Sequence, residues 1–365
     1  MAKLVKIFLI LRLMKILICP DSFKGTMSAS EAAEAIAEGL RSTMPEAALR
    51  LLPVGDGGEG TVNALCTALG NVEVVECETT DPLGRRVIAS YAITGSGTAL
   101  IESAAASGLT LVDEADRDIM KADTYGTGLL IADAWRRGVR DFIICMGGTA
   151  TCDGGLGARR AMIESGIPSL DNSAATSLEA KGFPSFTLLC DVDNPFCGPR
   201  GAAAVFGPQK GASSQQIPLL DSRLKTLASE YAKVSDIDVT DMKYAGAAGG
   251  LAGMLMACYG ATPVSGISKV LQLMDFEKQL EDADLVVTGE GRADATTLNG
   301  KAAKGILDIS RRHGVPVVLI GGQVADRDRL LTAGFHQVIQ ATSDAPDPAV
   351  APSEYLTRAA RTLQP

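Results

Sequence analysis

The sequence carries five glycine-containing stretches in which acidic, basic and hydroxyl side chains follow directly after apolar runs. The first is PDSFKG at residues 20–25, which contains Asp21, Ser22 and Lys24. A connection between two elements needs only turn-forming residues, whereas this one also supplies a carboxylate, a hydroxyl and an ammonium group. Ser28 is a suitable N-cap for the helix that follows. We therefore expect Asp21, Ser22 and Lys24 to contact a ligand.

The second stretch is VGDGGEGT at residues 54–61. Its glycines match the G-x-G-x-x-G pattern, and Glu78 follows at a distance typical of dinucleotide-binding folds. Asp56 and Glu59, however, place two carboxylates where a pyrophosphate would need bare backbone N–H groups. A divalent cation or the hydroxyls of a small substrate suit these carboxylates better. A plain turn is the structural alternative.

The third stretch is MGGTATCDGGLG at residues 146–157. The backbone amides of Gly147, Gly148 and Thr149 can line up on a phosphate as a nest. A helix expected over 155–165 would direct the positive end of its dipole toward the same place. The stretch also carries the carboxylate of Asp153. The alternative is a structural turn, although the stretch has more glycine than one turn needs.

The fourth stretch, residues 188–212, contains CDVDNP and GPQKGA. Asp191 and Asn194 follow a predicted strand, and ligands of α/β proteins bind at the carboxyl ends of strands. Asp191 is therefore a candidate general base, with an Asx-turn before Pro195 as the alternative. Lys210 is a candidate phosphate ligand, with a solvated surface lysine as the alternative.

The fifth stretch is VVTGEGRADATTLNGKAAKGI at residues 286–306. Glu290, Arg292 and Asp294 lie close to a strand end, and Lys301 opens the next predicted helix. An arginine in a glycine-rich turn can bind a carboxylate or a phosphate with two hydrogen bonds. The alternative is a surface network in which these charges pair with one another.

Several familiar catalytic patterns are absent from the sequence. It contains no G-x-x-x-x-G-K-[ST] segment and no protein-kinase H-R-D or D-F-G signature. Its 2 histidines, His313 and His336, lie outside the glycine-rich stretches, which argues against histidine-based hydrolysis and three-histidine zinc sites. Glycine combined with acids and with Lys or Arg suits phosphoryl transfer, where the protein positions groups and holds magnesium. The residues thus predict a small-molecule kinase or another phosphate-handling enzyme.

Composition narrows the class of protein further. The 365 residues carry a net charge of −9, which argues against broad binding to nucleic acid or to an anionic membrane. The 8 cysteines include no C-x-x-C pair and are expected to be reduced thiols in a cytoplasmic protein. Arg12 and Lys15 interrupt the N-terminal apolar run, and Met14 opens a plausible shorter protein. Residues 1–13 are therefore expected to be an over-extended start.

Apolar runs alternate with longer amphipathic ones, which is typical of βαβ units. Strands are expected over 15–19, 49–54, 72–77, 86–93, 98–102, 141–146, 185–190, 284–288, 315–320 and 336–340. Helices are expected over 28–43, 60–69, 126–138, 155–165, 221–234, 247–259, 268–281, 299–313 and 326–333. The expected fold class is α/β: a discontinuous Rossmann/flavodoxin-like parallel-sheet domain (1–78 plus 275–365) with an inserted mixed α/β domain (79–274). Residues 166–184 are expected to form a polar connection.

These stretches, in this order, resemble the glycerate kinase family. The matching motifs are PDSFKG, DGGEGT, TYGTG, GGTATCDGG, CDVDNP, GPQKGA, AGAAGGLA and GEGRADATTLNGKA. They extend from Met14 almost to the C-terminus. The resemblance implies a kinase unrelated to P-loop folds, which uses ATP and Mg²⁺ to phosphorylate D-glycerate, with 2-phosphoglycerate favoured over 3-phosphoglycerate.

The resemblance also suggests roles for the candidate residues. Arg292 or Lys24 would bind the glycerate carboxylate, with a phosphate as the alternative anion for Lys24. Asp191 would act on the attacking hydroxyl, either as general base or by orienting it. Further substrate contacts would come from Asp21, Ser22, Asp56, Glu59, Asn194 and Glu290. Nucleotide and phosphate contacts would come from Gly147, Gly148, Thr149, Lys210 and Lys301, and metal ligands from Asp153 and Asp294.

Two other classes of function stay open at this point. One is an NAD(P)-dependent oxidoreductase that uses residues 55–60. The other is a sugar-acid sensor that binds glycerate without catalysis. The sequence does not give the oligomeric state, and a homo-oligomer is one alternative.

Overall fold

The protein, described here by a computed structural model, divides into two compact units. The described residues are 13–170, 182–343, 347 and 349–364. The first unit comprises residues 1–53, 275–299 and 303–365, and the second comprises 54–274 and 300–302. Most of the N-terminal extension and of the polar connection expected at 166–184 lies outside the described residues.

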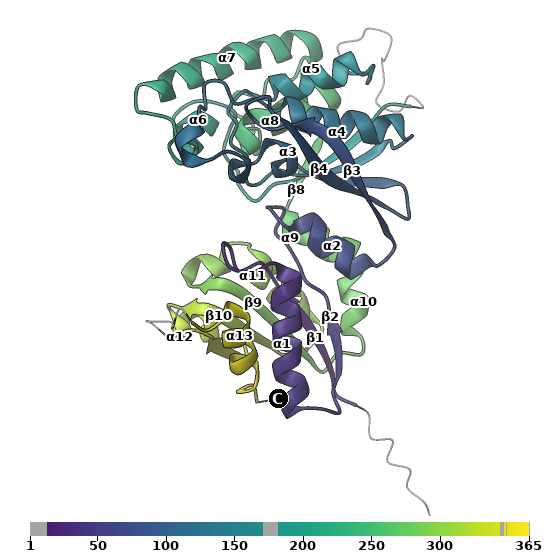
Figure 1. The fold of residues 1–365 in the computed structure, drawn as a ribbon, viewed down its shortest axis with the longest axis vertical. Helices are drawn as coiled ribbons and strands as arrows, with labels where there is room; N and C mark the ends of the chain where they lie inside the picture. The colour runs from purple at the N-terminus through teal and green to yellow at the C-terminus, as the bar shows by residue number, and fades with distance from the viewer. Residues whose placement is uncertain (1–12, 171–181, 344–346, 348, 365) are drawn as a thin grey trace, which may run out of the picture. The chain divides into compact units, whose positions relative to one another are not determined.

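The first unit contains an open sheet of five parallel strands (Figure 1). The strands are β1 (Lys15–Pro20), β2 (Ala48–Leu51), β9 (Leu285–Ala293), β10 (Val317–Val324) and β11 (Gln337–Gln340). Their spatial order is β11-β10-β9-β1-β2, so that within this unit the second strand lies outside the first and the later strands follow on the other side. This is the flavodoxin-like order, and it confirms the predicted parallel-sheet domain.

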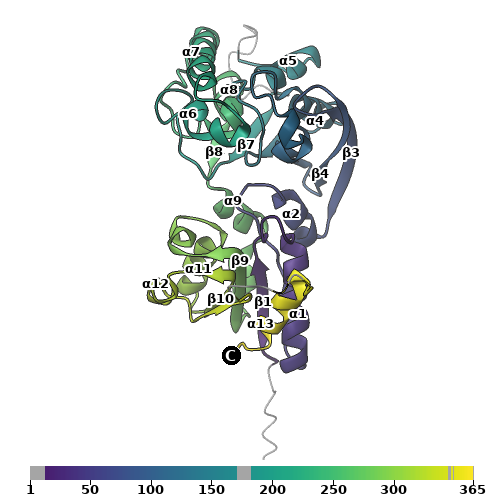
Figure 2. The same cartoon turned by 60° about the vertical axis from the view of Figure 1, so that its left-hand side comes forward.

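Helices cover both faces of this sheet. They are α1 (Ala29–Thr43), α10 (Phe276–Leu280), α11 (Ala302–Arg312), α12 (Arg327–Ala333) and α13 (Pro352–Ala360). In Figure 2, α1 and α13 lie on one side of the strands, and α11 and α12 lie on the other. Ile16, Ile36 and Leu356 belong to the core under α1 and α13, while the alternate strand residues Leu17 and Val286 are also buried. Burial on both faces explains the continuous apolar runs of these strands.

The start of α1 is fixed by the residues that the sequence indicated. Ser28 Oγ accepts a hydrogen bond of 3.2 Å from the Glu31 N–H, and the Glu31 carboxylate accepts one of 2.8 Å from the Ser28 N–H. This is a capping box. The helix therefore begins without any help from Asp21, Ser22 or Lys24.

The second unit contains a mixed sheet of six strands in the order β3-β4-β5-β6-β7-β8. The strands are β3 (Val72–Thr80), β4 (Arg86–Thr94), β5 (Thr98–Glu102), β6 (Asp141–Cys145), β7 (Ser185–Leu189) and β8 (Thr262–Val264). The β3–β4 and β4–β5 pairs are antiparallel, and the remaining pairs are parallel. Residues 54–78 belong to this unit, and β3 pairs with β4 along its whole length, whereas the sequence placed these residues in the first domain.

Helices of the second unit pack on this sheet. They are α2 (Thr61–Leu69), α3 (Ala104–Ser107), α4 (Tyr125–Arg136), α5 (Leu156–Glu164), α6 (Ala202–Phe206), α7 (Gln216–Ser235), α8 (Leu251–Tyr259) and α9 (Gly266–Leu273). Most of them contribute to one large core, whereas the buried residues of α2 and α9 lie outside it. The core includes Phe142 and Phe186, whose rings stack at 4.9 Å between centroids. In Figures 1 and 2, α2 and α9 lie next to each other at the strands of this unit.

Two predicted helices are interrupted in the structure. The helix expected over 247–259 begins with a 3-10 segment, Ala247–Gly250, in which Ala248, Gly249 and Gly250 all have positive φ. The helix expected over 268–281 is divided at Asp275, whose φ is 48°. Positive φ cannot continue a right-handed helix. The second interruption coincides with the boundary between the two units.

Candidate active site

The GDGGEG loop of the second unit lies directly on the loops that follow β6 and β7. The Gly147 N–H donates to the Gly57 carbonyl at 3.4 Å. A Cβ added to Gly147 would lie 2.7 Å from Gly58 Cα, and one added to Gly57 would lie 2.9 Å from Leu189 Cβ. Only glycine permits such close contact between backbones. Two of the predicted stretches, 54–61 and 146–157, are thereby brought together with the end of β7.

Asp191 joins this cluster through the start of α9. Its Oδ1 accepts a hydrogen bond of 3.2 Å from the Gly266 N–H. A Cβ on Gly266 would lie 1.7 Å from the Asp56 carbonyl oxygen, so Asp56 and Asp191 share this glycine as a neighbour. Burial raises the pKa of the Cys145 thiol, and the nearby charges of Glu102, Asp56 and Asp191 raise it further. Asp56 and Asp191 therefore have a common neighbour, and Glu102, which is paired with Cys145 in the register of β5 and β6, lies at the same end of the sheet.

Glu102 was missed by the sequence analysis. It ends β5, and its Oε1 accepts a hydrogen bond of 2.8 Å from the Val62 N–H in the first turn of α2. The Gly60 N–H also donates to this carboxylate. Burial raises the pKa of Glu102, although the two backbone hydrogen bonds oppose this shift. The rule that singled out Asp191, an acid at the end of an apolar strand, could have found Glu102 as well.

The bonds of Glu102 bear on what the GDGGEG loop can bind. A dinucleotide would need the N–H groups at the start of α2 for its pyrophosphate. The Glu102 carboxylate already accepts from Gly60 and Val62, two of the N–H groups at this helix start. The N–H groups that a cofactor phosphate would need are therefore already bound to a carboxylate of the protein itself. This contact argues against nicotinamide binding through residues 55–60.

Lys210 lies inside the second unit. Its ammonium donates to Thr149 Oγ1 at 3.0 Å and to the Thr151 carbonyl at 2.8 Å, and only 5% of the residue is exposed. Burial lowers the pKa of Lys210 to about 8. The structure thus brings together Lys210 and Thr149, both predicted as phosphate-binding. The ammonium holds the loop at 149–151 by these two hydrogen bonds. Lys210 is therefore not the solvated surface lysine that was considered as the alternative.

Asp153, a predicted metal ligand, is used within the fold. Its carboxylate accepts hydrogen bonds from the Thr124 N–H at 2.9 Å and the Thr124 hydroxyl at 2.8 Å. It also accepts from the N–H groups of Gly155 at 3.1 Å and Gly157 at 3.0 Å. These contacts tie the start of α4 to the start of α5. They account for Asp153 as a structural residue and give no support to a metal at this position.

Asn194 also has a structural contact in the second unit. Its side-chain amide donates to the Arg200 carbonyl at 2.8 Å, and its own carbonyl accepts from the Gly246 N–H at 3.0 Å. These bonds hold the turn around Pro195. Asp191 is exposed beside this turn, and Lys301 is half-buried just before α11.

In the first unit, the PDSFKG turn packs on the GEGR segment of β9. The Asp21 N–H donates to the Gly289 carbonyl at 2.9 Å, and Phe23 is buried. A Cβ on Gly291 would lie 3.5 Å from Phe23 Cα and 3.7 Å from the backbone nitrogen of Lys24. These residues lie where β1 and β9 are neighbours, which is the point at which the strand order reverses. Ligands of open α/β sheets bind at this switch point.

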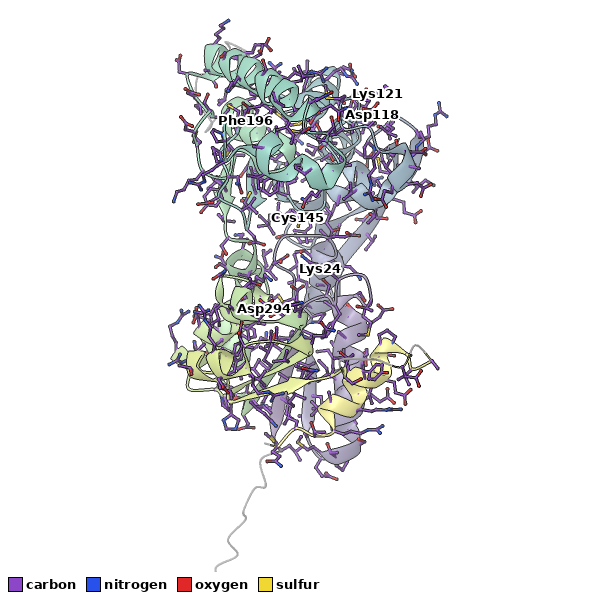
Figure 3. The ribbon with its side chains drawn as sticks, turned by 90° about the vertical axis from the view of Figure 1, so that its left-hand side faces the viewer. Lys24, Asp118, Lys121, Cys145, Phe196 and Asp294 are labelled. Atoms are coloured by element: carbon purple, nitrogen blue, oxygen red, sulfur yellow. The ribbon has the colours of Figure 1, made fainter. Side chains whose placement is uncertain are left out.

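The charged residues of the first unit gather at the same place. Lys24 is exposed there, and Glu290 is buried. Arg292 Nε lies 3.0 Å from Asp294 Oδ2. Asp294 also accepts from the Thr296 N–H at 2.8 Å, so it caps the 3-10 segment that follows. Figure 3 labels Lys24 and Asp294 in this unit.

Metal-ligating groups are sparse in the structure. Within the described residues, no group of three or more His, Cys, Asp or Glu side chains could hold a metal ion.

Among the same residues, no helix is long and apolar enough to span a membrane.

Comparison with known proteins agrees with the motifs. The model of the glycerate kinase family matches residues 16–364. The chain is 41% identical to a glycerate kinase of Bacillus subtilis over 96% of this chain and 97% of that protein. It is 41% identical to a glycerate 2-kinase of Escherichia coli over 86% of each chain. A crystal structure from Salmonella typhimurium LT2, assigned as glycerate kinase 2, superposes with a TM-score of 0.80 at 39% identity, covering 96% of this chain and 97% of that one.

These matches and the fold define the chain as an α/β kinase built from two units. It belongs to the glycerate kinase family. The resemblance inferred from the motifs is thereby confirmed.

Proposed function

We propose that this protein transfers the γ-phosphoryl group of ATP to a hydroxyl of D-glycerate, with 2-phosphoglycerate and ADP as products. The observation that carries this proposal is the contact of the GDGGEG loop with the loops after β6 and β7, which gathers Asp56, Glu102 and Asp191 at one end of the sheet. A glycine-rich backbone beside carboxylates suits phosphoryl transfer. The glycerate 2-kinase of Escherichia coli supports the choice of product.

Asp191 is the proposed general base. It is exposed at the end of β7, and the Gly266 N–H fixes one of its oxygens. In the reaction the glycerate hydroxyl oxygen forms a bond to the γ-phosphorus while the bond from that phosphorus to the ADP oxygen breaks. The hydroxyl proton passes to the Asp191 carboxylate and then to solvent. General-base catalysis of this kind contributes about 10²- to 10⁴-fold to a rate.

Lys24 and Arg292 are the proposed ligands of the glycerate carboxylate. Both lie at the switch point of the first unit, where the turn after β1 packs on β9. The side chain of Arg292 is exposed, so it can exchange its ion pair with Asp294 for one with a substrate carboxylate. Asp21, Ser22 and Glu290 flank this place and are proposed to contact the substrate.

Gly147, Gly148 and Thr149 are proposed to bind the phosphates of the nucleotide, with Lys301 as a further cation. Lys210 is proposed to position Thr149, because its ammonium is buried against that hydroxyl. Kinases bind Mg²⁺ through one or two carboxylates plus substrate phosphates. Asp56 and Glu59 would hold it. When bound, Mg²⁺ neutralises the charge of the transferring phosphates.

The proposal is tested by incubating the purified protein with D-glycerate, ATP and Mg²⁺ and following the product by ³¹P and ¹³C NMR. The expected result is a phosphate ester on carbon 2 of glycerate. A phosphate on carbon 3 would reverse the proposed regiochemistry. Binding of glycerate with no ester formed would favour the non-catalytic sensor.

A further inference from the structure

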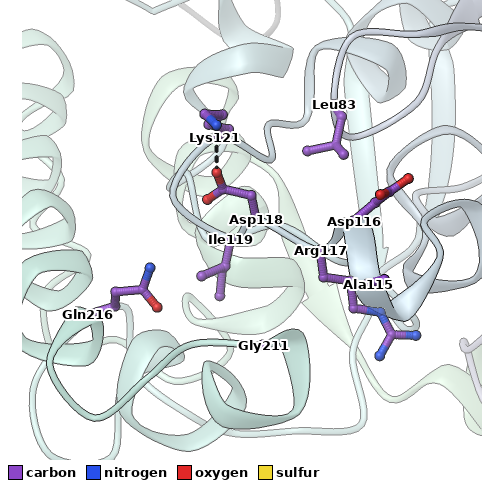
Figure 4. A pocket seen from close by; sticks show the side chains of 9 residues that line it. All are labelled: Leu83, Ala115, Asp116, Arg117, Asp118, Ile119, Lys121, Gly211 and Gln216. Atoms are coloured by element: carbon purple, nitrogen blue, oxygen red, sulfur yellow. Dashed lines mark ion pairs between the residues drawn. The ribbon is translucent and has the colours of Figure 1, made fainter.

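The second unit contains a hollow that neither the GDGGEG loop nor Asp191 lines, although Gly211 of the GPQKGA motif forms part of its wall. Its volume is about 480 Å³ (Figure 4). It is lined by Leu83, Ala115, Asp116, Arg117, Asp118, Ile119, Lys121, Gly211 and Gln216. These residues come from the turn after β3, from the segment before α4, and from the loop that leads into α7.

Hydrogen bonds hold the walls of this hollow in place. The buried Asp81 carboxylate accepts from the N–H groups of Leu83 and Arg85, both at 2.9 Å. The Arg85 guanidinium in turn donates to the Leu111 carbonyl at 3.2 Å and lies 3.4 Å from the Asp116 carboxylate. The DPLGRR turn is thereby tied to the segment that carries Ala115 and Arg117. The hollow is a built feature of the fold.

One of the cationic side chains that line the hollow, Arg117, is not paired with an acidic side chain within the described part of the chain. Lys121 pairs with Asp118 at 2.9 Å, and Asp116 pairs with Arg85. Arg117 has no ion pair or hydrogen bond among the residues that the structure describes, and its Nε is buried. A guanidinium in this state is available to an anion, and it binds phosphate with two hydrogen bonds.

Size and surface decide which anion fits. A volume of about 480 Å³ lies within the range of pockets that hold cofactor-sized ligands, and a three-carbon acid would leave most of it empty. Most of the lining of the hollow is polar, and Leu83, Ala115 and the buried Ile119 supply the smaller apolar part against which a flat ring can lie. An aromatic base joined to phosphate matches both the apolar surface and the spare cation.

The hollow is also connected to the phosphate-binding loop. Gly211 follows Lys210, and a Cβ on Gly211 would lie 3.5 Å from Arg117 Cβ. Lys210 holds Thr149 and the Thr151 carbonyl. The GPQKGA motif therefore forms a wall of the hollow on one side and supports the loop at 147–151 on the other. A ligand in the hollow lies next to the element that positions Thr149.

We propose that this hollow binds the nucleotide of the phosphoryl donor, with the base against Leu83 and Ile119 and a phosphate on Arg117. This inference rests on the proposed kinase function. It assigns to Arg117 and to the DPLGRR turn a part in recognising ATP.

Two variants test the proposal in different ways. Arg117→Gln removes the spare charge, and Ala115→Trp fills the hollow at an exposed position. Each variant is expected to raise the dissociation constant of ADP, measured by calorimetry, by about tenfold or more. Each is expected to raise the KM for ATP similarly, while the KM for D-glycerate stays within about twofold of wild type. Arg329→Gln, an exposed arginine on α12, is the matched control.

Thermal unfolding of each variant verifies that it is folded before binding is measured. Unchanged ADP binding by both folded variants would overturn the proposal. Weaker binding by Arg117→Gln alone would also overturn it, because the base would then lie elsewhere. If the wild-type protein does not phosphorylate glycerate yet both variants lose affinity for ADP, the nucleotide site in the hollow is supported and glycerate as the substrate is contradicted.

Discussion

The carboxylate of Glu102 lies 2.8 Å from the Val62 backbone nitrogen and so joins the end of β5 to the first turn of α2. The same carboxylate accepts from the Gly60 N–H. The GDGGEG loop is therefore held at its C-terminal end by an acid from a neighbouring strand. Asp56 and Glu59 owe their positions partly to this contact.

Replacing Glu102 by glutamine should destabilise the second unit and impair catalysis. An amide can accept one N–H group, but its own NH₂ would then face the other donor. A buried donor left without an acceptor costs about 1–3 kcal/mol. Urea unfolding measures this loss, and steady-state kinetics measures kcat. Glu76→Gln, at an exposed position on β3, should change neither; equal stability of the two variants would contradict the role given to Glu102.

Lys210 predicts a pH dependence of stability. Burial lowers its pKa in the folded protein to about 8 from the ordinary 10.5. Between these values the unfolded chain binds more protons than the folded one, so stability rises with pH in this window. The stability of wild type relative to Lys210→Met should therefore increase as pH rises from 8 to 10.5. Urea unfolding of both proteins across that range gives the difference, and a flat or falling difference would contradict a buried, destabilised ammonium.

Asp153→Asn separates a structural role from metal binding. The aspartate accepts four hydrogen bonds that join α4 to α5, and asparagine cannot accept them all. We expect a loss of about 2 kcal/mol or more in the free energy of unfolding. The Mg²⁺ concentration for half-maximal activity should stay unchanged. A variant of wild-type stability that needs much more Mg²⁺ would return Asp153 to the metal ligands; Asp113→Asn is the surface control.

Lys24→Met tests the binding of the glycerate carboxylate. Lys24 is exposed at the switch point of the first unit, so its loss should leave the fold intact. We expect the KM for glycerate to rise by about tenfold, with the KM for ATP nearly unchanged. Lys278→Met, an exposed lysine on α10, provides the comparison. An equal rise in both KM values would show that Lys24 does not act on glycerate specifically.

The sequence allowed most of the strands, the fold class and the family to be predicted, because alternating apolar runs and glycine motifs are local signals. The short strand β8 (Thr262–Val264) was not predicted. The division of the chain at residues 53 and 54 followed from the pairing of β3 with β4, which no local signal reveals. The two helices are interrupted because Ala248 and Asp275 have positive φ. Neither residue type indicates such a backbone conformation in the sequence.

For the candidate site, motif chemistry predicted which loops carry charged residues but not how deeply each residue is buried. Lys210 was predicted as a phosphate ligand, with a surface lysine as the alternative, and its side chain is buried inside the second unit. Asp153 read as a ligand and serves as a cap for two helices. Burial and hydrogen-bond partners depend on contacts between distant parts of the chain, such as Lys210 with Thr149. They could not be read from spacing.

The central claim is that Asp191 and the loops around it carry out phosphoryl transfer to glycerate. Its most direct test is kcat for D-glycerate phosphorylation by Asp191→Asn, with Asp193→Asn, two residues away at the surface, as the matched control. We predict that kcat of Asp191→Asn falls by about 10²-fold or more and that the control stays close to wild type. A folded Asp191→Asn protein whose kcat stays within a few-fold of wild type would contradict the account.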